Sequence, residues 1–285
     1  MTTKSTKSYC VYSVVAHQAL AAMQRDEPSV HISVDLNLTR STFPLCDDTL
    51  ILDTHNRLSR AQLQQIAGKA NRIFFLEDGE IEILENREDG YCKLVPTDQA
   101  PLLEIDGVKM HIAKGINPFE SAGQMAAQVV RKGGRILDTC SGLGYSASSA
   151  LNLGAREVIS VELNAAVMSL RIKNPWSRRI FGAGIHLVHA NIAEYIRDLA
   201  TESFDAVIHD PPRISLAGQL YGESFYREIH RVLKRRGLLF HYTGNPHRVQ
   251  HGSSFIDHAA QRLMGAGFTN VKKVVNLMGI SACKK

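Results

Sequence analysis

The first part of the chain contains short hydrophobic runs whose period changes along the sequence. Residues 9–24 carry apolar side chains at helical spacing, whereas apolar and polar side chains alternate through residues 30–38, the period of a half-buried strand. Another strand is expected at residues 49–53, and Ser59 is a suitable N-cap for a helix at residues 59–70. This stretch therefore mixes short strands with short helices.

Two Asp-Gly pairs mark further turns in the same part of the chain. Asp78-Gly79 lies within the hydrophobic residues 73–84, and Asp106-Gly107 separates residues 102–105 from residues 108–110. Asp-Gly favours the two-residue turn of a β-hairpin because both positions tolerate positive φ. The N-terminal part of the chain is therefore predicted to be rich in strands.

From residue 121 onward, helical and strand-like segments alternate. The expected strands are residues 135–138, 158–161, 185–188, 206–209, 237–242 and 271–277. The expected helices are residues 122–130, 147–153, 224–234 and 254–266. This rhythm is typical of a parallel sheet with helices on its faces. We therefore predict an α/β protein with a strand-rich domain of residues 1–115 and a Rossmann-like domain of residues 116–285.

Composition and charge narrow the class of protein. With 285 residues, of which 44% are hydrophobic and 21% charged, the chain can bury a large core. Its formal net charge of +5 permits contact with a phosphate backbone but does not require it. The five cysteines form no C-x-x-C pair, which favours a reducing compartment and gives no sign of a metal site. Because no hydrophobic run approaches the roughly 18 residues that a membrane span needs, we expect a cytoplasmic protein.

The segment from Ile136 to Glu162 contains the first candidate for chemistry. A strand ends at Asp138, and the turn Thr139-Cys140-Ser141-Gly142-Leu143-Gly144 leads into a helix. Ligands of open α/β sheets bind at the carboxyl ends of strands, and glycines allow the backbone to approach a ligand closely. Glu162 ends the next strand, where a carboxylate can accept both hydroxyls of a ribose.

The glycine spacing leaves alternatives open. Gly142-x-Gly144-x-x-Ala147 also fits the fingerprint of nicotinamide and flavin enzymes. Asp138 would repel the pyrophosphate of such a cofactor, whereas it would attract the cationic amino acid end of S-adenosylmethionine. A third interpretation is a turn that only connects strand to helix.

The residues Asp210-Pro211-Pro212-Arg213 form the most specific motif in the chain. They follow the hydrophobic strand that ends at His209, at the same predicted sheet edge as the glycine turn. The prolines fix their φ angles and stiffen the loop, and Asp210 offers an acceptor beside a transferring methyl group. The structural alternative is that Pro211-Pro212 simply ends a strand.

The glycine turn and the acids around it resemble those of the class I S-adenosylmethionine-dependent methyltransferases. In that family an acid precedes alternating glycines and a second acid ends the next strand, as Asp138 and Glu162 do here. The resemblance implies S-adenosylmethionine as the cofactor, with Cys140 in place of the family's first glycine and Asn191 in place of an acid near the adenine. The contacts that it implies are Asp138, Thr139, Cys140, Ser141, Gly142, Gly144, Glu162 and Asn191.

The second motif resembles the Asp/Asn-Pro-Pro-aromatic motif of amino-methylating class I enzymes. This resemblance implies catalytic roles for Asp210, Pro211, Pro212 and Arg213. Arg213 replaces the aromatic residue that stacks on a planar substrate in that family. This replacement weakens the implied specificity for adenine or guanine amino groups. A guanidinium nevertheless also stacks on bases and binds carboxylates or phosphates. Further candidates for substrate contact, each with structural packing or hydrogen bonding as its alternative, are His209, Tyr221, Tyr226 and His241.

Over nearly its whole length, the chain resembles a group of predicted prokaryotic methyltransferases distantly related to spermidine synthases. The resemblance includes Asn174-Pro175-Trp176-Ser177, and it implies a seven-stranded, mostly parallel sheet with a smaller strand-rich N-terminal domain. We therefore expect methyl transfer to a nitrogen, or as second choice an oxygen, of an RNA base or a small metabolite, with no membrane partner. The alternatives are aminopropyl transfer from decarboxylated S-adenosylmethionine to an amine and a non-catalytic binding module.

Overall fold

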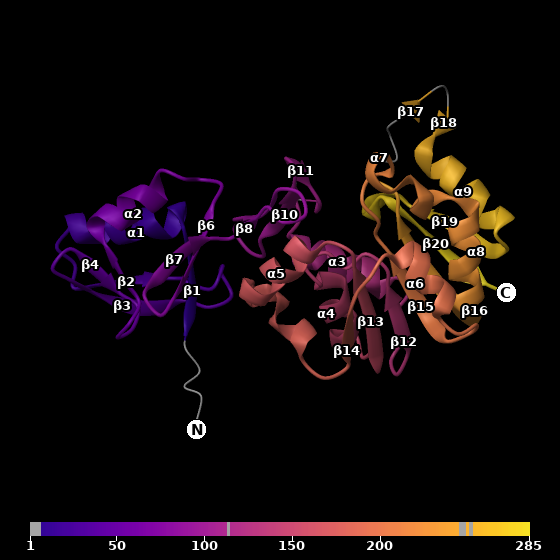
Figure 1. Cartoon of the computed structure of the whole chain (residues 1–285), viewed down its shortest axis with the longest axis horizontal. Coiled ribbons are helices and arrows are strands. Elements are labelled where there is room, and N and C mark those ends of the chain that lie inside the picture. The colour runs from indigo at the N-terminus through magenta and orange to yellow at the C-terminus, as the bar shows by residue number, and fades with distance from the viewer. Residues whose placement is uncertain (1–6, 113–114, 245–248, 251–252) are drawn as a thin grey trace. The chain divides into compact units, whose positions relative to one another are not determined.

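The computed structural model describes residues 7–112, 115–244, 249–250 and 253–285, which fall into two compact units (Figure 1). The first unit ends at Pro118 but also includes Ser169–Trp176, and the second comprises Phe119–Met168 and Ser177–Lys285. The domain boundary at residue 115 stays a prediction. The predicted second domain contains Ser169–Trp176, whereas the structure assigns these residues to the first unit. Among the described residues, no helix combines the length and the hydrophobicity that crossing a membrane requires.

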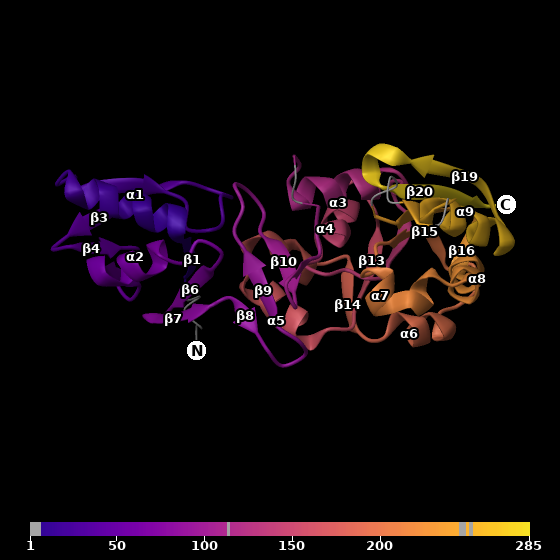
Figure 2. The ribbon, with the colours of Figure 1, turned by 90° about the horizontal axis from the view of Figure 1, so that it is seen from above.

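Small antiparallel sheets and two adjoining helices, α1 and α2, make up the N-terminal unit. The strands are β1 (Ser8–Tyr12), β2 (Ser29–Ile32), β3 (Ser41–Cys46), β4 (Thr49–Ile51), β5 (Arg57–Ser59), β6 (Ile73–Glu77), β7 (Glu80–Ile83), β8 (Glu85–Asn86), β9 (Cys92–Val95), β10 (Leu102–Ile105) and β11 (Val108–Lys109). They pair in the orders β1-β6-β7, β2-β3-β4-β5 and β11-β10-β9-β8. Helices α1 (Ser13–Gln24) and α2 (Arg60–Ala67) lie side by side (Figures 1 and 2).

Turn and cap chemistry explains where the predictions for this unit succeed. Both Asp-Gly hairpins are confirmed: Asp78 and Gly79 have φ values of 49° and 82°, and Asp106 and Gly107 have values of 47° and 78°. Helix α2 begins with a capping box at Ser59, whose hydroxyl accepts a hydrogen bond from the backbone N–H of Gln62. These features depend on neighbouring residues alone, so the sequence reveals them.

Two N-terminal predictions are wrong in part. Residues 8–12 form a strand instead of the start of a helix, because they pair with β6 over their whole length. The strand predicted for residues 30–38 ends at Ile32, and Leu36 and Asn37 adopt left-handed φ values of 57° and 68°. The side-chain amide of Asn37 donates to the hydroxyl of Tyr12, a contact that local sequence does not predict.

A seven-stranded sheet forms the centre of the second unit and confirms the predicted fold class. Its strands are β12 (Arg135–Asp138), β13 (Glu157–Glu162), β14 (Ile185–His189), β15 (Phe204–His209), β16 (Leu233–Tyr242), β19 (Phe268–Val274) and β20 (Gly279–Lys284). They are hydrogen-bonded in the order β14-β13-β12-β15-β16-β20-β19. The five strands from β14 to β16 in this order are parallel, and β20 runs antiparallel to both of its neighbours.

Helices connect these strands in the expected alternation. The α-helices are α3 (Pro118–Ala127), α4 (Tyr145–Asn152), α5 (Ala165–Lys173), α6 (Ile192–Asp198), α7 (Ile214–Ala217), α8 (Glu223–Val232) and α9 (Phe255–Gly265). The short 3-10 helices are η1 (Pro175–Phe181), η2 (Gly218–Tyr221) and η3 (Val275–Leu277), and the short strands β17 (Val249–Gln250) and β18 (Ser253–Ser254) pair antiparallel. The strand predicted for residues 271–277 is wrong at its end, because η3 and the left-handed Met278 (φ 51°) turn the chain back into the unpredicted β20.

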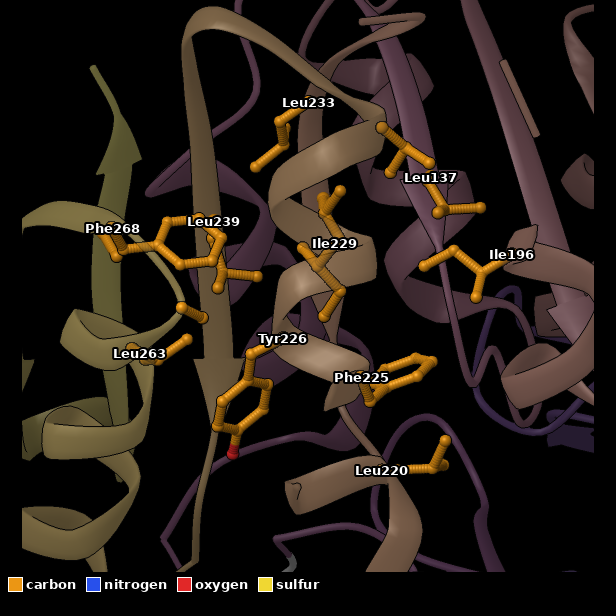
Figure 3. Close-up of a cluster of buried hydrophobic side chains, with 14 of the residues drawn as sticks. Leu137, Ile196, Leu220, Phe225, Tyr226, Ile229, Leu233, Leu239, Leu263 and Phe268 are labelled. Atoms are coloured by element: carbon orange, nitrogen blue, oxygen red, sulfur yellow. The ribbon is translucent and has the colours of Figure 1, made fainter. Parts of the chain in front are cut away.

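A hydrophobic cluster packs α8 and α9 against the sheet (Figure 3). Helix α8 buries Phe225, Tyr226, Ile229 and Val232, which recur at helical spacing along one of its faces. Leu239 of β16 belongs to the same cluster. Burial of one such side chain stabilises a fold by about 1.5–3 kcal/mol, so this packing holds β15 and β16 firmly and fixes where their carboxyl ends lie.

Candidate active site

The two motifs of the sequence leave the sheet at the same edge. Strands β12 and β15 are parallel neighbours, with Asp138 opposite Ile208. From β12 the sheet continues through β13 and β14 on one side and through β15 and β16 on the other. The strand order therefore reverses at β12, and this edge is the topological switch point at which open α/β sheets bind ligands. The glycine turn and the Asp-Pro-Pro loop therefore begin beside each other.

Asp138 is the last residue of β12 and is fully buried. Its Oδ2 accepts a hydrogen bond of 2.7 Å from the hydroxyl of Ser146 on α4. A buried carboxylate is costly unless hydrogen bonds or a cation compensate it, so the fold places an acid here that favours a positively charged group nearby.

The turn after Asp138 is fixed by bonds to the neighbouring strands. Thr139 donates its N–H to Ile208 O of β15 at 3.1 Å, while the N–H of Ser141 donates to Val161 O of β13 at 2.9 Å. Gly142 and Gly144 have φ values of 49° and 78°, a region that suits glycine. The turn therefore spans the gap between two strands, as a ligand-binding loop at a switch point should.

Glu162 ends β13 with its carboxylate held by the backbone. Its Oε2 accepts from Gly142 N at 2.8 Å, and its Oε1 accepts from Leu163 N at 3.0 Å and Asn164 N at 2.9 Å. The acid thus touches the glycine turn directly, and the two predicted cofactor carboxylates frame the same turn.

Asn191 follows β14 and acts as the N-cap of α6. Its Oδ1 accepts from Ala193 N at 3.0 Å, and its amide donates to Glu194 at 3.1 Å. The structure thus gives this side chain a capping role, and its predicted contact with adenine stays a prediction.

Cys140 lies in the turn in a partly buried position. Burial raises the pKa of its thiol well above the usual value, and the neighbouring Glu162 carboxylate adds to the effect. A protonated thiol is a poor nucleophile, so Cys140 contributes shape to the turn instead of covalent chemistry.

Asp210 is the titratable group of the second motif. Burial raises its pKa from 3.8 to about 7, and the Asp138 carboxylate adds to the shift. Pro211 is buried, Pro212 is partly exposed and Arg213 is exposed. A carboxyl group with a pKa near neutrality is suited to accept a proton at physiological pH.

Tyr221 braces the Asp-Pro-Pro loop from η2. Its hydroxyl donates to Pro212 O at 2.9 Å and lies 3.3 Å from Pro211 O. Burial raises the pKa of the phenol, so it stays protonated and remains a donor. This side chain, predicted as a substrate contact, is therefore a structural partner of the motif.

The other three substrate candidates form a buried polar chain next to the loop. The ring of His209 joins Thr139 Oγ1 at 2.8 Å to Leu220 O at 3.0 Å. Because a carbonyl only accepts, Nε2 of His209 carries the proton and Nδ1 accepts from the threonine hydroxyl. Burial lowers the pKa of His209 to about 4, so the ring is neutral at pH 7.

His241 extends this chain from β16. Its Nδ1 donates to His209 O at 3.3 Å, which leaves Nε2 to accept from the hydroxyl of Tyr226 at 2.8 Å. Both histidines and Tyr226 are fully buried and engaged with protein groups. Their contact with a substrate stays a prediction, while their place in the structure is that of a support for the strand ends.

Two features of the site lie outside the set of predicted site residues. Tyr242 ends β16, and burial raises its pKa to about 12. The negative charge of Asp210 adds to this shift and the positive charge of Arg213 opposes it, so Tyr242 lies within electrostatic range of Asp210 and Arg213. Ser177 and Ile180 of η1 contact the glycine turn. The position of Tyr242 at the end of a strand was an available signal for it, whereas no local pattern marks the η1 contacts.

The chain is similar to known proteins over most of its length. Residues 137–241 match the family described as a methyltransferase domain. The uncharacterized protein MJ1233 of Methanocaldococcus jannaschii is 38% identical over 283 residues, which cover 96% of this chain and 95% of that protein.

Solved structures share the fold at lower identity. A spermidine synthase in complex with the transition-state analogue AdoDATO aligns with a TM-score of 0.60 and 18% identity, covering 75% of this chain and 76% of that one. Spermidine synthase from Thermotoga maritima aligns with a TM-score of 0.54 and 18% identity, covering 73% and 77% of the two chains. At this level of identity the likeness establishes a shared fold.

Proposed function

Since the chain belongs to the class I S-adenosylmethionine-dependent methyltransferases, we propose that it methylates a nitrogen, or as second choice an oxygen, of an RNA base or a small metabolite. The observation that supports this proposal is that Asp210, a carboxyl group with a pKa near neutrality, leaves the sheet beside Asp138. A proton acceptor and a site for a cationic methyl donor thus meet at one edge.

The residues of the glycine turn fit the cofactor by their chemistry. Asp138 and Glu162 supply carboxylates at the ends of neighbouring strands, which suit an ammonium group and ribose hydroxyls respectively. A Cβ on Gly142 would meet no atom within 4 Å, so the turn has open space at that position. When bound, the cofactor supplies a methyl group activated by a positively charged sulfur. We assign the adenine contact to Asn191, whose side-chain oxygen can accept a hydrogen bond from the adenine amino group in addition to the one from Ala193 N.

Asp210 is the proposed proton acceptor. A nitrogen that gains a methyl group must lose a proton, and Asp210 receives it on a carboxylate oxygen. A base with a pKa of about 7 is deprotonated in a large share of molecules at neutral pH and still binds a proton well. The pKa that burial imposes is therefore matched to the reaction.

The rest of the motif orients this carboxylate and the acceptor. Pro211 and Pro212 restrict the backbone, and the Tyr221 hydroxyl bond to Pro212 O removes further freedom from the loop. Arg213 is exposed at the end of the motif, where its guanidinium can stack on a planar ring or bind an anionic group of the acceptor. Correct alignment of reacting atoms is a large source of rate acceleration.

The test compares Asp210→Asn with wild type in an assay that measures S-adenosylhomocysteine release from fractionated cellular RNA and, separately, from a small-molecule extract. We expect turnover to fall by about 100-fold or more, the usual size of a general-base contribution, with little change in cofactor affinity. Asp198→Asn is the matched control, because Asp198 is an exposed carboxylate at the end of α6. Wild-type turnover in Asp210→Asn would contradict the role of Asp210.

Aminopropyl transfer is the alternative that the same fold permits. The donor would then be decarboxylated S-adenosylmethionine and the acceptor a polyamine, which favours pockets lined by several acids. The exposed cation of Arg213 beside Asp210 disfavours such an acceptor. Turnover with decarboxylated S-adenosylmethionine and a diamine, but not with S-adenosylmethionine, would replace our proposal with this one.

A further inference from the structure

The 3-10 helix η1 presents one buried face with a period of three. Residues at i and i+3 eclipse in a 3-10 helix, and Ser177 and Ile180 are both buried, as is Asn174 immediately before the helix. Arg178 and Arg179 are exposed on the other side. The helix therefore has a defined inner face, although it contains few residues.

This inner face contacts the middle of the glycine turn. The hydroxyl of Ser177 donates to Leu143 O at 2.8 Å, a buried bond between residues 34 positions apart in sequence. A Cβ on Gly144 would lie 2.6 Å from Cγ2 of Ile180, so the absence of a side chain at this position allows η1 to pack this closely. Ser177 and Ile180 of the same helix therefore both contact the glycine turn, one by a hydrogen bond and the other by packing.

The bond from Ser177 acts on one particular peptide group. The peptide that joins Leu143 to Gly144 accepts from Ser177 through its oxygen, and its N–H donates to Ser141 O at 2.6 Å. Glycine imposes little resistance to rotation of an adjacent peptide plane. A bond at each end of this peptide therefore supplies the stiffness that the glycine lacks.

We propose that Ser177 is a positioning residue for cofactor binding, which acts by fixing the Leu143–Gly144 peptide of the glycine turn. The proposed role needs no contact with the cofactor, because the buried Ser177 hydroxyl acts through its bond to Leu143 O. Its effect is to keep the turn in the binding conformation before the cofactor arrives, which lowers the entropic cost of association. The inference rests on the use of S-adenosylmethionine by this family and not on the identity of the methyl acceptor.

The test is isothermal titration of Ser177→Ala with S-adenosylmethionine and S-adenosylhomocysteine. Loss of one buried hydrogen bond that preorganises the turn is expected to raise both Kd values by about threefold to tenfold. Ser203→Ala is the matched control, because Ser203 also donates its hydroxyl to a backbone carbonyl, Ala200 O at 2.6 Å, but before β15 at the opposite end of the strand from the site. Its Kd values should equal those of wild type.

A second variant separates the hydrogen bond from packing and stability. Ser177→Thr keeps the hydroxyl, and its Kd values should stay closer to wild type than those of Ser177→Ala. Unchanged Kd values in Ser177→Ala, or equal weakening in the alanine and threonine variants, would overturn the proposal, as would a wild-type protein that binds neither ligand. A protein that binds both ligands but methylates no nitrogen or oxygen acceptor would instead contradict the proposed function and leave the Ser177 result interpretable.

Discussion

Asp210 should destabilise the folded protein as the pH rises, and Asp210→Asn should remove that effect. Burial, with a contribution from the Asp138 carboxylate, raises the pKa of Asp210 from 3.8 to about 7 in the folded state. In the unfolded chain the same carboxyl ionises at its ordinary value. Between these two pKa values the folded protein binds more protons than the unfolded one, so its stability decreases as the pH increases.

The size of the effect follows from the two pKa values. Complete ionisation of Asp210 in the folded state, as at about pH 8, costs about 4 kcal/mol relative to the unfolded chain. At about pH 5.5 the group is ionised in the unfolded chain but protonated in the folded one, and the cost is about 2 kcal/mol. Because Asp210 is partly exposed, solvent reduces both figures, and we expect a change of about 1–2 kcal/mol between the two conditions.

The assay is urea denaturation of wild type and Asp210→Asn at about pH 5.5 and about pH 8. The free energy of unfolding of the asparagine variant, measured relative to wild type, should increase by about 1–2 kcal/mol from the lower to the higher pH. Asp198→Asn, an exposed carboxylate, should show no such trend. A difference between Asp210→Asn and wild type that is independent of pH would refute the raised pKa and with it the match between Asp210 and a proton-accepting role.

Further predictions concern the turn, the loop and the acceptor. Asp138→Asn should weaken S-adenosylmethionine binding by about tenfold or more, since it removes the charge that attracts an ammonium group; titration calorimetry measures this, and an unchanged Kd would remove Asp138 from the site. Gly144→Ala should lower Tm and weaken the same binding, because φ is 78° and the added Cβ meets Ile180; a fully stable, tightly binding variant would contradict the described packing. Tyr221→Phe loses the bond to Pro212 O and should reduce turnover by about fivefold or more with unchanged cofactor affinity; equal turnover would mean that the loop needs no such brace. If RNA is the acceptor, its affinity should fall by about tenfold between about 50 and about 200 mM salt, whereas a flat response would indicate a small neutral acceptor.

The parts of the fold that local sequence determines could be predicted. The Asp-Gly hairpins, the capping box at Ser59 and the buried strands before Asp138 and Asp210 each depend on residues close together in the chain. Parallel strands place their carboxyl ends at one edge, so the proximity of the two acids followed from their positions after strands.

The parts that depend on distant partners could not be predicted. The left-handed turn at Asn37 is held by Tyr12, and β20 forms against β16 and β19 after a turn at Met278, whose left-handed φ is uncommon for a methionine. The bond from Ser177 to Leu143 O joins segments that only the folded chain brings together. The sequence also left open whether His209 and His241 contact a substrate or make structural hydrogen bonds, and the fold places both in a buried hydrogen-bonded chain.

The most direct test of the central claim is isothermal titration of the full-length protein with S-adenosylmethionine, S-adenosylhomocysteine, decarboxylated S-adenosylmethionine and NAD in turn. We predict binding of the first two, weaker binding of the decarboxylated form because the carboxylated amino acid end is recognised, and no binding of NAD because Asp138 repels a pyrophosphate. Preferential binding of NAD, or no binding of either methylated or demethylated cofactor, would contradict it.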